Sequence, residues 1–371
     1  MSEWRTTNLG SVVTLQRGFD LPSRLRRRGP VPIVSSSGTS GWHDRAMVKA
    51  PGVVTGRYGT IGEVFFECAD FWPLNTTLWV SDFHGNDERF VYYLLQRLDF
   101  AAHSGKSGVP GVNRNDLHAE PVSLPVSVDE QRAIADALSD CDALIEQLER
   151  VIAKKQAVKQ GIAQRLLTGL TRLPGFTSGA WEPQPLRQGA TLISGNHVMA
   201  KDCNTQGVGT PYLTGPADFP HGRIRQTKFT TRPGALCRAG DILVTVKGSG
   251  SGSMVEADSE YCISRQLMAV RPSEWDSRFL FYSLLHHASH IKAASTGLIP
   301  GLSRSDILDQ LLPVPPTVEE QRAVAATLTA IDQQVENLER AVAKKEALKK
   351  GMMQELLTGR TRLPIQGEET A

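Results

Sequence analysis

The chain has 371 residues, which is enough for two domains of ordinary size. Its 41 Lys and Arg residues nearly balance 39 Asp and Glu residues, so the net charge of +2 neither identifies nor excludes a nucleic-acid partner. The five cysteines include no C-x-x-C pair, which argues against a structural zinc site and against a disulfide framework. Without an apolar leader or an apolar run of about 18 residues, the sequence predicts a cytoplasmic protein that does not span a membrane.

The first segment, residues 1–126, is predicted to form a globular domain. Its short apolar runs, such as VVTGRYGTIGEVFF, are broken by Gly and Thr, a pattern typical of strands joined by tight turns. The later stretch RFVYYLLQRL is predicted to form a helix. We therefore expect an α+β domain, called here the first domain.

Basic residues that could contact DNA gather in several places of the first domain. The stretch SRLRRRG carries arginines at a density that suits phosphate contact, although an exposed loop with solvated charge explains it equally well. The short sequence SGKS lacks the earlier glycine of a phosphate-binding loop, so no nucleotide site is predicted there. The candidate DNA-binding residues of this domain are Arg24, Arg26, Arg27, Arg28, Arg57, Tyr58, Lys106 and Arg114.

The second segment, residues 127–176, is predicted to be one long helix. Ser127 and Glu130 form a capping-box pair at its start, and Gly169 followed by Pro174 marks its end. Between them, apolar residues recur at alternating spacings of four and three, which predicts a coiled-coil seam. A helix of about 40 residues would be roughly 60 Å long. The seam residues are Ile134, Leu138, Cys141, Ile145, Leu148 and Ile152.

The third segment, residues 177–316, is predicted to be a second α+β domain. Its strand-like run DILVTVKGSGSGSMV and its helix-like run RFLFYSLLHHASHI correspond to runs of the first domain, whereas HGRIRQTKFTTR has no counterpart. Basic residues present in both domains suit a sequence-independent phosphate contact, although a salt bridge or a turn contact explains them too. The candidate DNA-binding residues here are His221, Arg223, Arg225, Lys228, Lys247 and Arg304.

No stretch of the chain predicts catalysis or a metal site. The run GSGSGS follows a predicted strand and is expected to be a hairpin turn. His286, His287 and His290 could meet on one helix face, but no carboxylate lies at a matching spacing, so an ordinary surface helix is expected. Hydrolase, metalloprotease and adenine-methyltransferase motifs are absent from the sequence.

The fourth segment, residues 317–371, repeats the second. Shifting the chain by 190 residues aligns Val128–Pro174 with Val318–Pro364, and 27 of these 47 positions are identical. Thr317 and Glu320 repeat the capping box, and the apolar seam recurs. We predict two α+β domains, each followed by a long helix, with the helices paired as an antiparallel coiled coil of internal pseudo-twofold symmetry. The repeated seam residues are Val324, Leu328, Ile331, Val335, Leu338 and Val342.

This order of segments resembles the specificity (S) subunit of type I restriction-modification systems, over essentially the whole chain. The strongest motifs are LPVSVDEQRAI and LPVPPTVEEQRAV at the two helix starts and the endings LLTGLTRLP and LLTGRTRLP. The turn GRYGTIG and the stretches RFVYYLL and RFLFYSLL support the resemblance more loosely. The end IQGEETA departs from the first copy.

The resemblance implies a protein that binds DNA without catalysing a reaction itself. Residues 1–126 and 177–316 would be target recognition domains, each reading one half of a bipartite asymmetric site in double-stranded DNA. Residues 127–176 and 317–371 would be helical spacers that set the gap and dock two methyltransferase (M) subunits, which use S-adenosylmethionine. Two restriction (R) subunits using ATP and Mg would complete the complex, so this chain is expected to bind no cofactor or metal.

Two other functions remain open at the level of the sequence. A tandem-repeat adaptor would use both domains to bind proteins rather than DNA, with the helices acting only as spacers. A self-contained nuclease or methyltransferase would need catalytic motifs that the sequence lacks. Sequence-specific DNA binding would distinguish the first of these from the specificity subunit.

Overall fold

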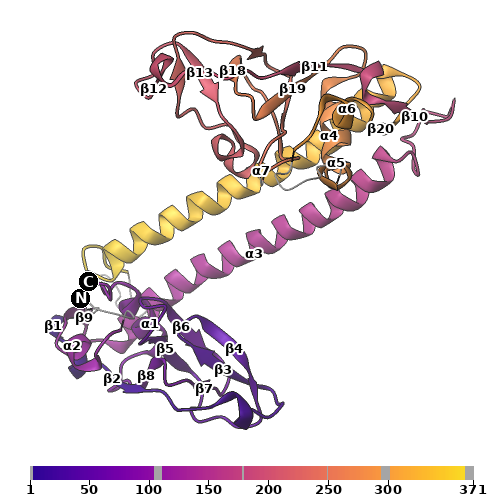
Figure 1. The fold of residues 1–371 in the computed structure, drawn as a ribbon. Helices are drawn as coiled ribbons and strands as arrows, with labels where there is room; N and C mark the ends of the chain where they lie inside the picture. The colour runs from indigo at the N-terminus through magenta and orange to yellow at the C-terminus, as the bar shows by residue number, and fades with distance from the viewer. Residues whose placement is uncertain (1–2, 104–110, 178, 249, 294–300, 364–371) are drawn as a thin grey trace, which may run out of the picture. The chain divides into compact units, whose positions relative to one another are not determined.

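The computed structural model describes residues 3–363 apart from 104–110, 178, 249 and 294–300. The chain forms two compact units. Unit 1 consists of Met1–Glu149 with Arg340–Ala371, and unit 2 consists of Arg150–Glu339. Each unit therefore contains one of the predicted globular domains together with part of each long helix (Figure 1).

The globular part of unit 1 is built from small, mostly antiparallel sheets. A four-stranded sheet has the order β2 (Thr14–Arg17), β8 (Thr77–Asp82), β5 (Gly52–Gly56) and β6 (Val64–Glu67). A three-stranded sheet has the order β4 (Gly38–His43), β3 (Val31–Ser35) and β7 (Trp72–Pro73). Strand β1 (Trp4–Asn8) pairs with β9 (Pro121–Pro125). The helical segments are η1 (Leu9–Ser11), η2 (Ser23–Leu25), α1 (Glu88–Gln96) and α2 (Arg114–His118).

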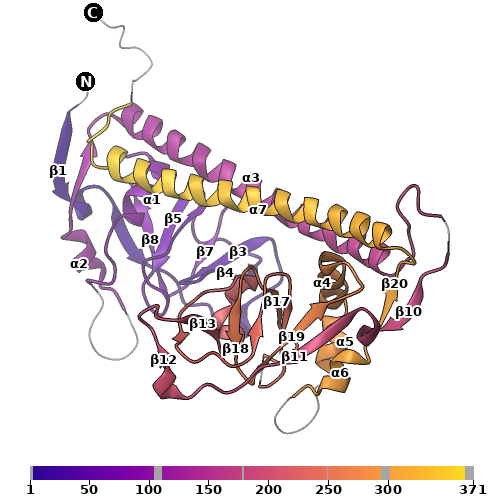
Figure 2. The same cartoon turned by 90° about the horizontal axis from the view of Figure 1, so that it is seen from above.

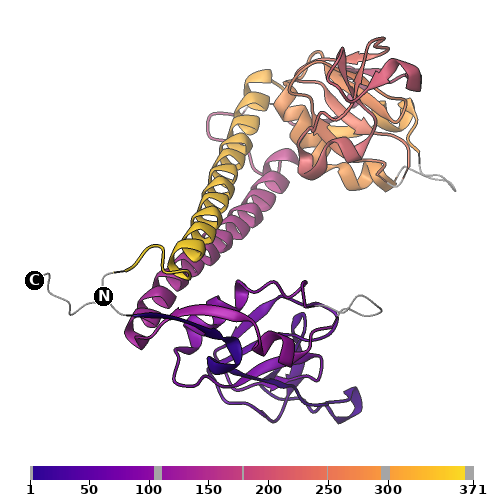
Figure 3. The ribbon, with the colours of Figure 1, turned by 90° about the vertical axis from the view of Figure 1, so that its left-hand side faces the viewer.

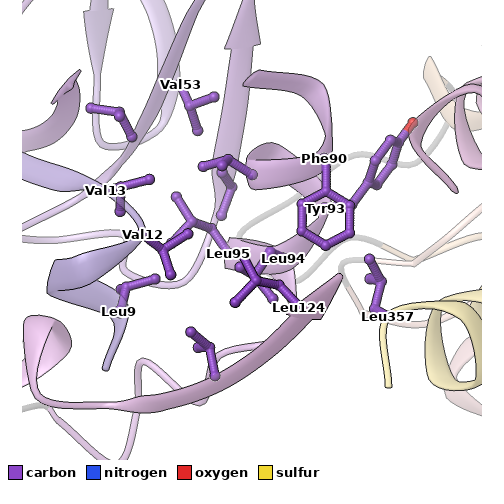
Figure 4. Close-up of a cluster of buried hydrophobic side chains, with 14 of the residues drawn as sticks. Leu9, Val12, Val13, Val53, Phe90, Tyr93, Leu94, Leu95, Leu124 and Leu357 are labelled. Carbon is purple, nitrogen blue, oxygen red and sulfur yellow. The ribbon is translucent and has the colours of Figure 1, made fainter. Parts of the chain in front are cut away.

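The core of unit 1 lies where α1 covers the four-stranded sheet. Phe90, Leu94 and Leu95 on α1 are almost completely buried, and they pack with residues of β1, η1, β9 and the start of α3 (Figure 4). Leu357 comes directly after helix α7 and more than 260 residues after α1, and it belongs to the same cluster. The end of the chain therefore completes the core of its first domain.

Unit 2 repeats the four-stranded sheet and replaces the other one. The repeated sheet has the order β11 (Ala190–Ser194), β19 (Leu267–Pro272), β16 (Ile242–Thr245) and β17 (Met254–Glu256). A five-stranded sheet has the order β12 (Cys203–Asn204), β14 (Phe229–Thr230), β13 (Thr210–Leu213), β18 (Tyr261–Ile263) and β15 (Leu236–Cys237). Strand β10 (Glu182–Pro185) pairs with β20 (Leu311–Val314). The α-helices are α4 (Ser277–His286), α5 (Ala288–Ala293) and α6 (Arg304–Leu308), and the 3-10 helices are η3 (Leu186–Gln188), η4 (Ala200–Asp202), η5 (Pro216–Asp218) and η6 (Pro220–Gly222).

Helices α3 (Val128–Leu167) and α7 (Val318–Leu356) pair in an antiparallel manner within each unit (Figure 2). In unit 1, the Lys349 ammonium lies 2.6 Å from the Asp142 carboxylate. In unit 2, the equivalent pair joins Lys159 to Asp332 at 2.5 Å. Residue numbers rise along one helix as they fall along the other, and every predicted seam residue is buried or half-buried. These contacts confirm the predicted fold class. None of the described helices is long and apolar enough to cross a membrane.

The repeated ending LLTG-x-TRLP attaches each long helix to the start of the other one. In unit 2, Arg172 donates two hydrogen bonds to the Glu320 carboxylate, at 2.8 and 2.6 Å, and Trp181 donates a third at 3.2 Å. In unit 1, Arg362 and Trp4 make the same contacts with Glu130. Both glutamate side chains are only 1% exposed. The predicted capping hydroxyls do accept a helix amide, but the carboxylates also have this ion-pairing role, which the sequence did not predict.

A second repeated contact fixes each globular domain on its long helix. The Tyr93 hydroxyl on α1 donates a hydrogen bond to Asp142 at 2.7 Å, and the Tyr282 hydroxyl on α4 does the same to Asp332 at 2.7 Å. Burial is the main reason why the pKa of both phenols is raised, to about 12 for Tyr282. In unit 2 the end of α3 packs beside α4 (Figure 3). There, Leu167 of α3 belongs to the same buried cluster as Phe279 and Tyr282 of α4.

We predict that Arg172→Met lowers the free energy of unfolding of unit 2 by about 3 kcal/mol, because it leaves a buried carboxylate without its bidentate partner. Urea unfolding checks this. The matched control is Arg322→Met, since Arg322 is 67% exposed and 3.9 Å from Asp276, and its loss is expected to stay within about 0.5 kcal/mol. Equal losses in the two variants would contradict the role assigned to the buried pair.

Candidate nucleic-acid interface

A cavity of about 460 Å³ on the first domain brings together three arginines from separate parts of the chain. Two of them, Arg57 and Arg114, were predicted from the sequence, and the third, Arg17, was not. None of the lining residues that the structure describes is acidic. The lining residues are Arg17, Arg57, Tyr58, Leu78, Gly111, Val112, Asn113 and Arg114.

The turn after β5 positions Arg57 and Tyr58 at this cavity. Their backbone amides donate to the Thr76 carbonyl at 2.8 and 3.1 Å, and the Arg57 carbonyl accepts from the Val112 amide at 2.9 Å. The Arg57 guanidinium lies over the Tyr58 ring, 4.5 Å from its centroid, in a cation–π contact. At Gly111 a Cβ atom would lie 2.3 Å from the Tyr58 ring, so a glycine is needed for this close approach.

The other two arginines reach the cavity from α2 and β2. Arg114 is the first residue of α2, where the Asn113 side chain caps the helix by accepting from the Asn115 amide at 3.0 Å. Arg17 ends β2, and its guanidinium lies 3.1 Å from the carboxylate of Asp20. No sequence motif marks Arg17, because its place depends on the pairing of β2 with β8.

In the second domain, Lys247 and Arg304, which align in sequence with Arg57 and Arg114, have different surroundings. Lys247 is exposed, and its backbone forms an isolated bridge with Gly301, as Tyr58 does with Gly111 in the first domain. The guanidinium of Arg304 donates to the Ser194 hydroxyl and to the Leu192 carbonyl, both at 2.9 Å. Arg304 therefore connects α6 to β11, which is the structural alternative that the sequence left open.

The arginine-rich stretch of the first domain forms η2 and the loop after it. Arg24, Arg27 and Arg28 are exposed, whereas Arg26 is half-buried and its Nε donates to the Leu21 carbonyl at 3.4 Å. Next to this loop, the Arg27 amide donates to the His43 ring at 3.0 Å on β4. The preceding residue of β4, Trp42, is 58% exposed. The arginine-rich loop thus lies beside a strand that carries an exposed aromatic residue.

The basic loop of the second domain includes η6 and the chain up to β14. The Arg223 guanidinium lies 3.2 Å from the carboxylate of Glu336 on α7, within unit 2. Arg225 and Lys228 are exposed, and the Arg225 amide donates to the Asp218 carbonyl at 2.7 Å. His221 lies in η6. Lys106 and the sequence SGKS lie outside the described residues.

Both halves of the chain match the family described as type I restriction modification DNA specificity domain, over residues 1–160 and 180–349. The chain belongs to this family. The match confirms the resemblance predicted from the repeated helices and their endings. It does not identify individual contact residues, so the candidate DNA-binding residues stay predictions.

Similar proteins agree with the family assignment. A putative type I restriction enzyme MjaX specificity subunit from Methanocaldococcus jannaschii is 29% identical over 265 residues, which is 68% of this chain and 62% of that protein. The MjaVIII specificity subunit of the same organism is 24% identical over 75% of this chain and 71% of that protein. The chain thus matches less than two thirds of the length of the MjaX subunit.

Two solved structures share the fold of this family member. The type I S subunit from M. genitalium has a TM-score of 0.69 and 18% identity, with 96% of each chain covered. A chain from a study of complex assembly and conformational transition of the type I R-M system has a TM-score of 0.57 and 22% identity, with 97% of each chain covered. Both similarities concern the arrangement of the backbone.

The described residues of this family member include no group of three His, Cys, Asp or Glu side chains arranged to hold a metal ion. His286 and His287 have ring centroids 5.1 Å apart, and His287 lies 5.8 Å from His290. The His287 Nδ1 atom is 2.9 Å from the Ser283 carbonyl of the same helix. Burial, with a smaller contribution from the neighbouring rings, lowers the pKa of His286.

His118 connects α2 to β2, the two elements that carry Arg114 and Arg17. Its Nε2 atom accepts a hydrogen bond from the Leu15 amide at 2.9 Å, so the ring is neutral in this contact. Burial lowers the pKa of His118, and the charges of Arg114 and His84 lower it further. This neutral ring therefore helps to hold the elements that carry Arg114 and Arg17.

We predict that acid weakens this connection. Since the pKa of His118 is lower in the folded chain than the usual 6.5, its stabilisation is present above about pH 6.5 and is lost as the pH falls through the folded value. Thermal unfolding of the wild type and of His118→Gln between pH 7.5 and 5.5 measures this. The variant should lose less stability on acidification than the wild type, although His286 leaves some dependence of stability on pH in both proteins. The same dependence on pH in the two proteins would contradict the prediction.

Proposed function

We propose that this chain is the DNA specificity subunit of a type I restriction-modification complex. In this proposal residues 1–126 and 177–316 each recognise one half of a bipartite, asymmetric site in double-stranded DNA. The observation that carries the proposal is the match of both halves of the chain to the DNA specificity family. The arginine-lined cavity and the exposed basic loops supply the positive charge that contact with DNA phosphates requires.

The unequal divergence of the two repeats supports recognition of two different half-sites. The long helices keep the same ion pairs in both units, whereas the first domain has a three-stranded sheet where the second has a five-stranded one. Such a pattern fits two recognition domains of different specificity attached to one conserved pair of helices. We propose that residues 127–176 and 317–371 form the spacer that sets the gap between the half-sites.

The proposal assigns the chemistry to partner subunits. Two near-identical helical surfaces suit the docking of two copies of one partner, here the methyltransferase subunit, and two restriction subunits would join that core. S-adenosylmethionine, ATP and Mg would be used by those partners. The chain would itself be non-catalytic and would act in the cytoplasm.

An adaptor that binds proteins through both domains is the competing function. It predicts no preference for any DNA sequence, whereas the specificity subunit predicts a preference that persists at moderate salt. Selection of bound duplexes from a random pool, using the chain with its methyltransferase partner, separates the two. A bipartite consensus supports the proposal, and an unselective pool favours the adaptor.

The same selection tests the independence of the domains. Exchanging residues 177–316 for the corresponding segment of another family member should change one half of the consensus and leave the other half and the gap unchanged, because each domain carries its own contacts. Exchange of residues 1–126 is the matched control and should change the opposite half. Loss of both halves in either exchange would show that the domains do not read DNA separately.

A further inference from the structure

The position in the second domain that corresponds to the cavity of the first domain has different side chains. Strand β2 pairs with β8 so that Arg17 lies opposite Leu78, and β11 pairs with β19 so that Ser194 lies opposite Met268. Leu78 and Met268 are related by the repeat offset of 190 residues. Arg17 and Ser194 therefore occupy equivalent positions in the two sheets.

The difference between Arg17 and Ser194 gives different surroundings to Arg114 at the start of α2 and to Arg304 at the start of α6. In the second domain, Arg304 donates to the Ser194 hydroxyl at 2.9 Å. In the first domain, Arg114 faces a strand whose equivalent residue is Arg17, a second guanidinium that has only donors. The hydrogen bond from Arg304 to the Ser194 hydroxyl therefore has no equivalent in the first domain, where Arg17 and Arg114 both line the cavity.

The described wall of this cavity carries positive charge without a matching acidic residue. Arg17, Arg57 and Arg114 contribute three positive charges, and no carboxylate lies among the described lining residues. Asp20 pairs with Arg17, but that pair is exposed, with 51% and 65% of the two side chains accessible, and is therefore well screened. Like charges gathered in one cavity repel each other, and an anion bound among them removes that cost.

We propose that this cavity binds a phosphate group of the DNA backbone, and that the first domain alone holds DNA in this way. Guanidinium groups match the oxygens of a phosphate with paired hydrogen bonds. The second domain lacks the same set, since Val246 and Lys247 take the structural positions of Arg57 and Tyr58, and Arg304 is bonded to its own domain. The proposal rests on the proposed function and adds an asymmetry between the two domains.

A phosphate contact and a base contact leave different signatures in DNA binding. Loss of a phosphate contact weakens binding to every sequence by the same factor and lowers the dependence on salt, because one fewer counterion is released. Loss of a base contact weakens binding to the target alone and relaxes the preference at one position. The cavity is assigned to the first class.

The test uses the full chain with its methyltransferase partner and compares Arg114→Ala with the wild type. Dissociation constants are measured between 50 and 200 mM salt for the selected target and for a duplex with both half-sites scrambled. We expect Arg114→Ala to bind both duplexes roughly tenfold more weakly at low salt and to reduce the slope of log K against log salt by about 0.9. Arg17→Ala should act in the same direction.

Arg304→Ala is the matched control in the second domain. It removes the same charge, but from a side chain bonded to β11, so we expect a lower thermal midpoint and an unchanged salt slope. An unchanged slope for Arg114→Ala, or a loss confined to the target duplex, would overturn the phosphate site. A wild type without preference for the target would instead contradict the proposed function, so the two failures are distinguishable.

Discussion

The buried carboxylates at the start of the two long helices are the constraint on which the rest of the architecture depends. Glu130 and Glu320 are each 1% exposed, and a carboxylate so far from water is stable only with a hydrogen-bonded cation beside it. That cation comes from the end of the other helix, as Arg362 or Arg172. The repeated ending LLTG-x-TRLP is therefore needed twice because each copy completes the domain that precedes the opposite helix.

The repeat explains how much of the fold could be predicted from the sequence. Apolar spacing over residues 134–152 and 324–342 specifies a helix seam, and two nearly identical seams in one chain favour antiparallel pairing. The reciprocal pairs Lys159–Asp332 and Lys349–Asp142 agree with this prediction. The order of the strands in the two domains was not predictable, because short strands broken by glycine do not determine their partners.

The candidate site shows why residue type alone is a weak guide to function. Arg114 and Arg304 look equivalent in the sequence, yet one lines a cationic cavity and the other donates to β11. The difference arises from Arg17 and Ser194, which are 97 and 110 residues away from Arg114 and Arg304 in the chain and become their neighbours only through strand register. Charge beside a turn glycine was visible in the sequence, but the groups that satisfy that charge were not.

The most direct measurement of the central claim is a map of N6-methyladenine in host DNA, by single-molecule sequencing, with this gene intact and with it deleted. If the chain directs a methyltransferase to a bipartite site, methylation at one split, asymmetric motif disappears in the deletion strain and returns when the gene is restored. Identical maps from strains in which the methyltransferase partner is expressed would contradict the account.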